Sequence, residues 1–176
     1  VINYFQAVEN LRIANKLPSN FKGIHLDIEP HTLPDWEEKR QDYSVQLLDL
    51  FHILKKKYPQ ISINFDQPVW YNFQKTTYKG VEKPFNQHVQ DITDITTLMD
   101  YRDTATRIIA DAQQELDYAQ IIDKPVYIGI ETQDLPQEED FISFFEEGEK
   151  YMNQELNKVK ENYVGIDAFA GISIHY

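Results

Sequence analysis

The sequence predicts an α/β fold in which helices cover a parallel sheet, and within this class it favours the parallel (β/α)8 TIM-barrel type. Segments with strand periodicity and segments with helix periodicity alternate along the chain, which is typical of parallel sheets. Each strand segment carries apolar side chains on one face and polar side chains on the other. An open doubly wound sheet favours nearly continuous apolar strands, whereas polar residues near the carboxyl ends of strands suit a barrel mouth.

Five strands are expected where apolar and polar residues alternate over a short segment. In the first of them, Ile24, Leu26 and Ile28 share one face, and the other face is polar. The same alternation recurs four times further along the chain. The expected strands are residues 21–29, 61–65, 95–101, 125–131 and 170–176.

Helices are expected where apolar residues recur every three or four positions. The longest begins after Asp35, and Glu38 stands three residues later, which indicates a capping box. Between residues 67 and 94 the pattern weakens, and a long loop of this kind inside a domain usually carries function. The expected helices are residues 5–17, 36–54, 85–90, 104–122 and 141–159.

The length of the chain limits how much of a barrel it can contain. A barrel of about 250 residues uses roughly 31 residues per strand-helix unit, so 176 residues have room for about five to six units. The chain is expected to open on a helix and to end on a strand. Residues 1–176 are therefore interpreted as a single domain, the last five strands (4 to 8) of a larger barrel whose N-terminal half belongs to the parent chain.

Composition excludes several classes of partner and site. The chain has 17 Lys and Arg against 29 Asp and Glu, a net charge of −12, which disfavours binding to nucleic acid or to an anionic membrane. It has no cysteine, which excludes disulfide scaffolds and cysteine nucleophiles. The longest apolar stretches are strand-sized, so no membrane insertion is expected. The sequence leaves the localisation of the protein open, and secretion or a place on the cell surface is one of the possibilities.

Two motifs resemble one family of enzymes. The first strand segment reads Phe-Lys-Gly-Ile-His-Leu-Asp-Ile-Glu and is similar to the fourth-strand motif D-G-x-D-x-D-x-E of chitinase-type (family 18-like) TIM-barrel glycoside hydrolases. Gly23, Asp27 and Glu29 match it, whereas His25 stands at an aspartate position. Further along, the segment from Met99 to Tyr101 resembles the sixth-strand M-x-Y of the same family. The resemblance implies a carbohydrate-active hydrolase that acts on a glycan or oligosaccharide without a cofactor.

The resemblance also implies roles for individual residues. Glu29 would be the acid/base, Asp27 would orient the acetamido group of the sugar, and Tyr101 would donate a hydrogen bond to that group. The residues themselves suit this chemistry, because neighbouring carboxylates such as Asp66 raise the pKa of an acid that must stay protonated near neutral pH.

A second mechanism uses Glu131. The large retaining glycosidase clan places its acid at the end of the fourth strand and its nucleophile at the end of the seventh, and Glu29 and Glu131 fit these places. Ile28 stands where that clan usually has asparagine. The substrate-assisted mechanism and the direct-displacement mechanism both stay open.

Further polar and aromatic residues are expected to bind substrate beside these carboxylates. Flat aromatic side chains at a barrel mouth offer platforms for sugar rings. We expect the polar strand residues to converge on one face, while Ile24, Ile63, Leu98, Ile128 and Ile172 pack against helices. The candidate substrate-binding residues are His25, Asn64, Asp66, Trp70 and His175.

Two alternatives compete with a glycoside hydrolase. Metal ligation by His25, Asp27, Glu29 and His31 would give a metal-dependent hydrolase, although the favoured interpretation contains no metal. A catalytically inactive barrel that binds a glycan or a protein would also explain the departures from the family pattern. Lys22 and His25 stand where that family has aspartates, and His175 stands where its eighth strand usually ends in tryptophan.

Overall fold

The computed structural model describes residues 1–136 and 140–176. Its centre is a five-stranded sheet in the order β1-β2-β5-β6-β7, and all neighbouring strands in it are parallel. The predicted α/β class and the five parallel strands are confirmed. The strands are β1 (Gly23–Leu26), β2 (Ser62–Pro68), β5 (Ile95–Met99), β6 (Val126–Glu131) and β7 (Phe169–His175).

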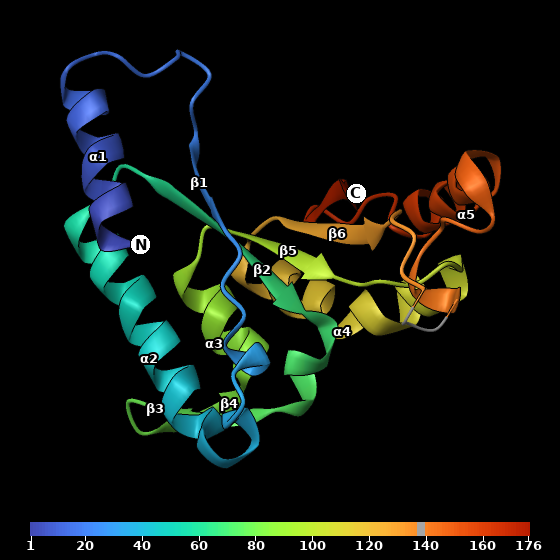
Figure 1. Cartoon of the computed structure of the whole chain (residues 1–176), viewed down its shortest axis with the longest axis horizontal. Helices are drawn as coiled ribbons and strands as arrows, with labels where there is room; N and C mark the ends of the chain where they lie inside the picture. The colour runs from blue at the N-terminus through green and yellow to red at the C-terminus, as the bar shows by residue number, and fades with distance from the viewer. Residues whose placement is uncertain (137–139) are drawn as a thin grey trace.

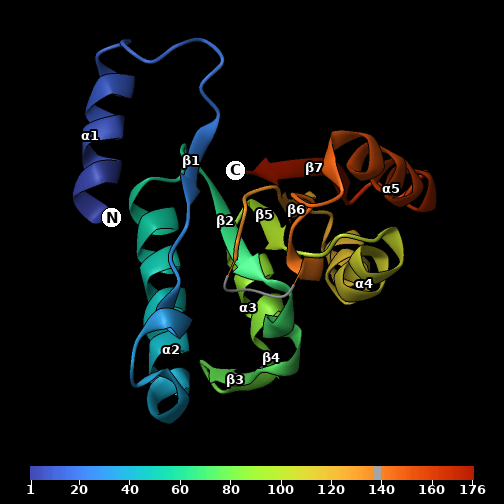
Figure 2. The same ribbon diagram turned by 45° about the vertical axis from the view of Figure 1, so that its right-hand side comes forward.

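Helices link successive strands of the sheet and lie around one side of it. Figures 1 and 2 show the sheet curving, with α2, α3, α4 and α5 outside the curve and α1 beside α2. The helices are α1 (Ile2–Ile13), α2 (Trp36–Lys57), α3 (Phe85–Ile92), α4 (Ala105–Ile122) and α5 (Gly148–Asn162). Short 3-10 helices are η1 (Pro30–Thr32), η2 (Val69–Phe73) and η3 (Asp140–Ile142).

The apolar strand residues form a core against the helices. On β1 and β2 they pack with α1, α2 and α3, and the ring of Phe65 meets that of Phe51 at a centroid distance of 4.8 Å. On β5 and β6, Leu98 and Ile128 are fully buried with residues of α4 and α5. Each such side chain contributes about 1.5–3 kcal/mol of burial energy. The core fixes which face of every strand is left for polar residues.

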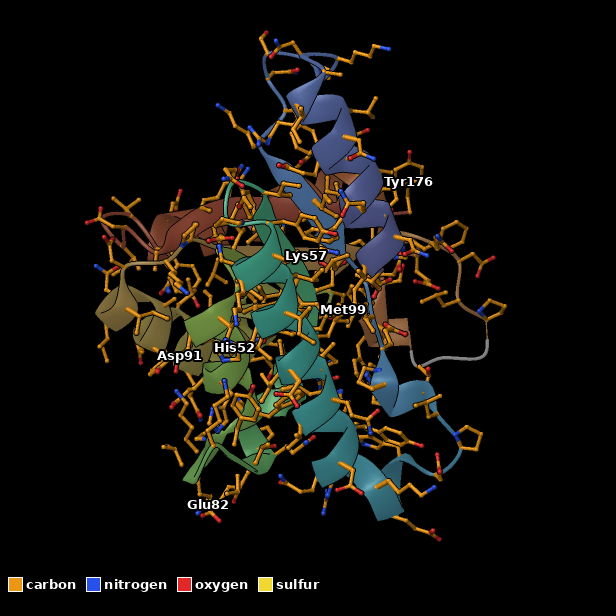
Figure 3. All side chains as sticks on the ribbon, turned by 90° about the vertical axis from the view of Figure 1, so that its left-hand side faces the viewer. His52, Lys57, Glu82, Asp91, Met99 and Tyr176 are labelled. Atoms are coloured by element: carbon orange, nitrogen blue, oxygen red, sulfur yellow. The ribbon has the colours of Figure 1, made fainter. Side chains whose placement is uncertain are left out.

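A β-hairpin occupies part of the segment expected to be a loop. The strands β3 (Lys75–Tyr78) and β4 (Val81–Pro84) pair antiparallel and form a separate two-stranded sheet. Lys79 and Gly80 adopt positive φ angles of 50° and 81° in the turn between them. Figure 3 shows Glu82 of this hairpin at the end of the molecule opposite α1.

The start expected for one helix and the capping box expected for another were wrong, although α2 begins at Trp36 as expected. The helix expected from residue 141 begins at Gly148, whose φ of 75° interrupts a right-handed helix. The capping box at Asp35 does not form, because the Asp35 carboxylate binds Lys39 and Tyr43, at 2.6 and 2.7 Å. Periodicity located both helices but not the local contacts that begin them.

The sheet has two edges among the described residues. β1 and β7 each pair with one neighbour, so a closed barrel is not shown. None of the helices described is both long and apolar enough to cross a membrane.

Candidate functional site

Polar side chains gather on the face of the sheet turned away from the helices, called the inner face below. Asp66 on β2 is in register with Thr97 on β5, and Glu131 on β6 is in register with His175 on β7. Because all five strands run the same way, their carboxyl ends meet at one edge of the sheet. The candidate residues from different strands therefore lie together there.

Tyr101 lies at the centre of this group, two residues after the end of β5. Burial, together with surrounding negative charges, raises the pKa of its hydroxyl to about 12, so the group stays protonated across the physiological range. The ring of Tyr101 stacks on that of His175, with centroids 6.0 Å apart and planes 6° apart. The charges around the hydroxyl come from the carboxylates of Glu131, Asp66, Asp27 and Glu29.

His25 and Asp66 form the first of two histidine-carboxylate pairs. Nε2 of His25 lies 2.6 Å from the Asp66 carboxylate, and Nδ1 lies 3.2 Å from the side-chain amide of Asn64. The hydroxyl of Thr97 donates in turn to the side-chain oxygen Oδ1 of Asn64 at 3.2 Å. The hydrogen bond to Asp66 raises the pKa of His25, although burial opposes it. The second oxygen of Asp66 is buried and has no hydrogen-bond partner among the residues that the structure describes.

Glu131 and His175 form the second pair. The backbone amides of Thr132 and Gln133 donate to Oε1 of Glu131 at 2.6 and 2.7 Å, and Nδ1 of His175 donates to Oε2 at 2.6 Å. Burial alone would raise the pKa of Glu131, but these donors outweigh it and hold the pKa below its usual value. Glu131 is therefore an ionised carboxylate whose two oxygens are both occupied, while the His175 side chain is 59% exposed.

Asp27 and Glu29 extend beyond the end of β1. The strand ends at Leu26, and Pro30 begins η1 directly after Glu29. The hydroxyl of Thr32 donates to the Glu29 carbonyl at 2.8 Å, which fixes the turn. Asp27 is exposed and Glu29 is half-buried, so both carboxylates reach solvent. Glu29 lines the larger pocket described next.

Two adjoining pockets open at this edge of the sheet. The larger, of about 450 Å³, is lined by residues that include Glu29, Trp70, Tyr101 and Glu131. The smaller, of about 180 Å³, lies on the inner face between the two histidine-carboxylate pairs. Met99 and Tyr101 line both pockets, and Figure 3 shows Met99 near the middle of the molecule.

An aromatic wall closes one side of the larger pocket. Trp70 on η2 is 39% exposed, and its ring meets the His31 ring at a centroid distance of 5.2 Å. Trp36 and Tyr71 pack behind these two rings. Burial lowers the pKa of His31, although Glu29 and Asp27 oppose it, so the imidazole is neutral near pH 7. The wall presents flat apolar surface beside Glu29.

All nine candidate residues lie at this edge or on the inner face. Two further residues line the larger pocket, His31 and Arg102, and neither was predicted to contact the substrate. His31 was considered only as a metal ligand, although its position two residues after Glu29 was a signal of proximity. Arg102 lines the larger pocket, but its guanidinium binds Asp111 at 3.0 Å and the Tyr101 carbonyl at 2.8 Å. Within residues 1–136 and 140–176, no group of three or more His, Asp or Glu has a geometry that could hold a metal ion, which gives the metal alternative no support.

Comparison with known proteins finds no matching family model, no matching curated protein and no matching solved structure. The inference about function therefore rests on the residues and geometry of this site.

Proposed function

We propose that this chain carries the catalytic face of a carbohydrate-active hydrolase, a glycosidase in which Glu29 is the acid/base. The observation that carries the proposal is that Glu29, Glu131 and Tyr101 line one pocket with an aromatic wall, and that the pocket adjoining it at Tyr101 is lined by Asp66. Glycoside hydrolysis needs a carboxylic acid at the leaving oxygen and negative charge near the oxocarbenium-like transition state. Flat rings such as Trp70 suit the apolar face of a sugar.

The same geometry supports a TIM-barrel parent fold. Strands that are consecutive in the sheet follow one another in the chain, and the helices lie on one side, as in part of a barrel. Doubly wound sheets instead reverse their strand order and carry helices on both faces. We propose that further strands of the parent protein complete the sheet beyond β1 and β7, which would remove the two open edges.

Two mechanisms assign different tasks to these residues. In the substrate-assisted mechanism, the acetamido oxygen of the substrate attacks the anomeric carbon, Asp27 orients the acetamido group and Tyr101 donates a hydrogen bond to it. The protonated state of Tyr101 supports this donor role. In the displacement mechanism, Glu131 attacks the anomeric carbon. Glu131 is ionised as a nucleophile must be, but His175 and two amides occupy its oxygens, which favours substrate assistance.

The test is release of reducing sugar by the full-length gene product from oligomers of N-acetylglucosamine and of glucose. We expect turnover that falls by at least about a hundredfold in Glu29→Gln, because general acid catalysis contributes roughly 10²–10⁴-fold. Substrate assistance predicts that the glucose oligomers are not turned over and that Asp27→Asn lowers turnover of the acetamido substrates. A control, Glu161→Gln, removes an exposed carboxylate on α5 and should leave turnover unchanged.

A second function is a glycan-binding module without turnover. The engagement of both Glu131 oxygens disfavours displacement by Glu131, and the departures from the family motif at Lys22, His25 and His175 are what a loss of activity would also produce. Saturable binding of oligosaccharide together with no reducing sugar, in wild type and Glu29→Gln alike, would establish binding and exclude hydrolysis.

A further inference from the structure

The candidate site has more negative charge than its own cations can neutralise. His25 and His175 pair with Asp66 and Glu131, so each histidine offsets at most one charge. Asp27 and Glu29 take part in no ion pair among the described residues. With both histidines protonated, the four carboxylates around Tyr101 still leave an excess of two negative charges, or of one when Glu29 carries the proton that it donates as general acid.

Arg102 does not neutralise this excess of negative charge. Among the residues that the structure describes, it is the only Arg or Lys that lines the larger pocket. Its Nε binds Asp111, its Nη1 donates to the Tyr101 carbonyl, and its guanidinium lies 5.7 Å from the centre of the Phe141 ring. The positive charge of Arg102 is therefore neutralised by Asp111 and does not offset the carboxylates of the pocket. The pocket therefore repels an anionic ligand and attracts a cationic one.

The aromatic wall adds a second attraction for a cation. A cation over the face of an exposed tryptophan is stabilised by the ring quadrupole, and the stabilisation increases when a carboxylate lies on the other side. Trp70 is exposed and lines the same pocket as Glu29. His31, which meets Trp70 edge to ring, is neutral near pH 7 and contributes no competing charge.

We infer that this pocket selects glycans that carry protonated amines, such as partly de-N-acetylated oligomers of glucosamine, and rejects glycans that carry carboxylates. The inference rests on the proposed function, which identifies the ligand as a glycan. It adds that the bound sugar unit carries a positive charge. An ammonium group would lie over the Trp70 face, in the field of the surrounding carboxylates and on a sugar unit other than the one that Glu29 protonates, while an acetylated unit could occupy the inner face near Tyr101.

The experiment measures binding and turnover separately with four hexasaccharides: fully acetylated, half-deacetylated and fully deacetylated glucosamine oligomers, and oligogalacturonate. Binding is followed by calorimetry and by tryptophan fluorescence at pH 6, in 20 mM and 300 mM salt. We expect the half-deacetylated oligomer to bind at least about tenfold more tightly than the fully acetylated one at low salt. Screening at high salt should reduce this preference, and oligogalacturonate should not bind.

Variants locate the source of the preference. Glu29→Gln and Trp70→Leu should each reduce the preference for amines, whereas Glu161→Gln changes the net charge by the same amount far from the pocket and should preserve it. Both substitutions lie at exposed or half-exposed positions, and circular dichroism checks that the variants fold. Loss of the preference in Glu161→Gln as well would show that only the overall charge matters, which overturns the inference.

The outcomes separate this inference from the proposed function. Salt-sensitive, amine-selective binding without turnover of any oligomer retains the inference and overturns hydrolysis. Turnover of neutral oligomers with equal affinity for charged and uncharged sugars retains hydrolysis and overturns the inference. Absence of binding to every oligomer overturns both.

Discussion

Nδ1 of His175 lies 2.6 Å from Oε2 of Glu131, and the two side chains join the ends of β7 and β6. An ionised carboxylate can only accept hydrogen bonds, so Nδ1 of His175 carries a proton, and in the neutral form of the ring Nε2 is the nitrogen without one. The ring of His175 is thereby held against Tyr101 with Nε2 free to accept a proton. Glu131 acts on the site through the orientation and tautomer of His175.

The first prediction concerns this pair. Glu131→Gln keeps an oxygen for the amides of Thr132 and Gln133 but turns an NH2 group toward Nδ1 of His175, so the imidazole should move its proton to Nε2. Nitrogen NMR of the His175 ring should show this tautomer change directly. If the chain is hydrolytic, turnover should fall by about tenfold or more with an altered pH profile, as for other residues that orient a functional side chain.

A matched variant distinguishes orientation from folding. Thr132→Ala removes a hydroxyl that donates to the His175 carbonyl but leaves the Thr132 amide and the Glu131 carboxylate in place. It should preserve the His175 tautomer. An unchanged Nδ1-protonated ring in Glu131→Gln would contradict the prediction.

The sequence predicted the strands and their faces well, because alternation reflects burial directly. Ile24 and Ile63 are buried against helices, whereas His25 and Asp66 face the other way, as expected from their parity along the strand. Parallel pairing then places polar residues of neighbouring strands side by side. The alternation of faces and the parallel pairing together predicted that the candidate residues would lie close to one another.

The partners within the site could not be predicted in the same way. Whether Glu131 would be free or would bind His175 depends on side-chain rotamers and on the turn after β6, which periodicity does not encode. The hairpin β3–β4 was missed for a related reason. Its strands have only four residues each, and the contacts that hold it come from distant elements, such as the hydrogen bond from Tyr78 to Asp49 on α2.

The second prediction concerns His25. The hydrogen bond to Asp66 raises the pKa of His25, so Asp66→Asn should return that pKa toward 6.5. The raised pKa contributes stability that is fully present below pH 6.5 and is lost as the pH rises through the higher folded value. Proton NMR titration of the imidazoles provides the measurement. His52, whose pKa is lowered by burial on the opposite side of the fold, serves as the internal control; unchanged titration of both rings would refute the assignment.

The third prediction concerns Lys124, which caps the end of α3. Its Nζ donates to the backbone carbonyls of Gln90, Asp91 and Thr93, each at 2.7 Å. Lys124→Met keeps the aliphatic length but leaves three carbonyls without this donor, so the free energy of unfolding should fall by about 2 kcal/mol. Urea denaturation measures it.

The control for this substitution is Lys160→Met, at an exposed position near the end of α5. Exposed substitutions of this kind usually change stability by less than about 0.5 kcal/mol. Equal effects of the two substitutions would mean that the capping contacts of Lys124 contribute nothing measurable.

The fourth prediction concerns two buried acids, Asp100 just after β5 and Glu115 on α4. Burial raises the pKa of Asp100 to about 8, with Asp111 and Glu115 adding to the shift and Arg102 opposing it. Burial likewise raises the pKa of Glu115 to about 8. Both carboxyl groups are therefore protonated in the folded protein at neutral pH, and neither Asp100 oxygen has a hydrogen-bond partner in the structure.

The sign of the pH dependence follows from these shifts. Above pH 4 the unfolded chain releases the Asp100 proton, while the folded chain keeps it until about pH 8. The stability associated with protonated Asp100 is thus present below pH 4 and is lost as the pH rises to 8, at up to about 1.4 kcal/mol for each pH unit. Asp100→Asn removes this linkage because an amide does not titrate. The variant should be more stable than wild type at pH 7 by about 1 kcal/mol or more, since the unmet hydrogen bonds of the amide offset part of the gain.

Urea midpoints at pH 4, 5, 6, 7 and 8 test the prediction. The wild-type curve should decline over this range, and the Asp100→Asn curve should decline less steeply, so that the two separate as the pH rises. Asp42→Asn, at an exposed position on α2, is the matched control and should follow the wild-type curve. Parallel curves for wild type and Asp100→Asn would mean that Asp100 is ionised in the folded protein, and a buried anion of that kind would require a positive partner other than Arg102, whose charge is held by Asp111.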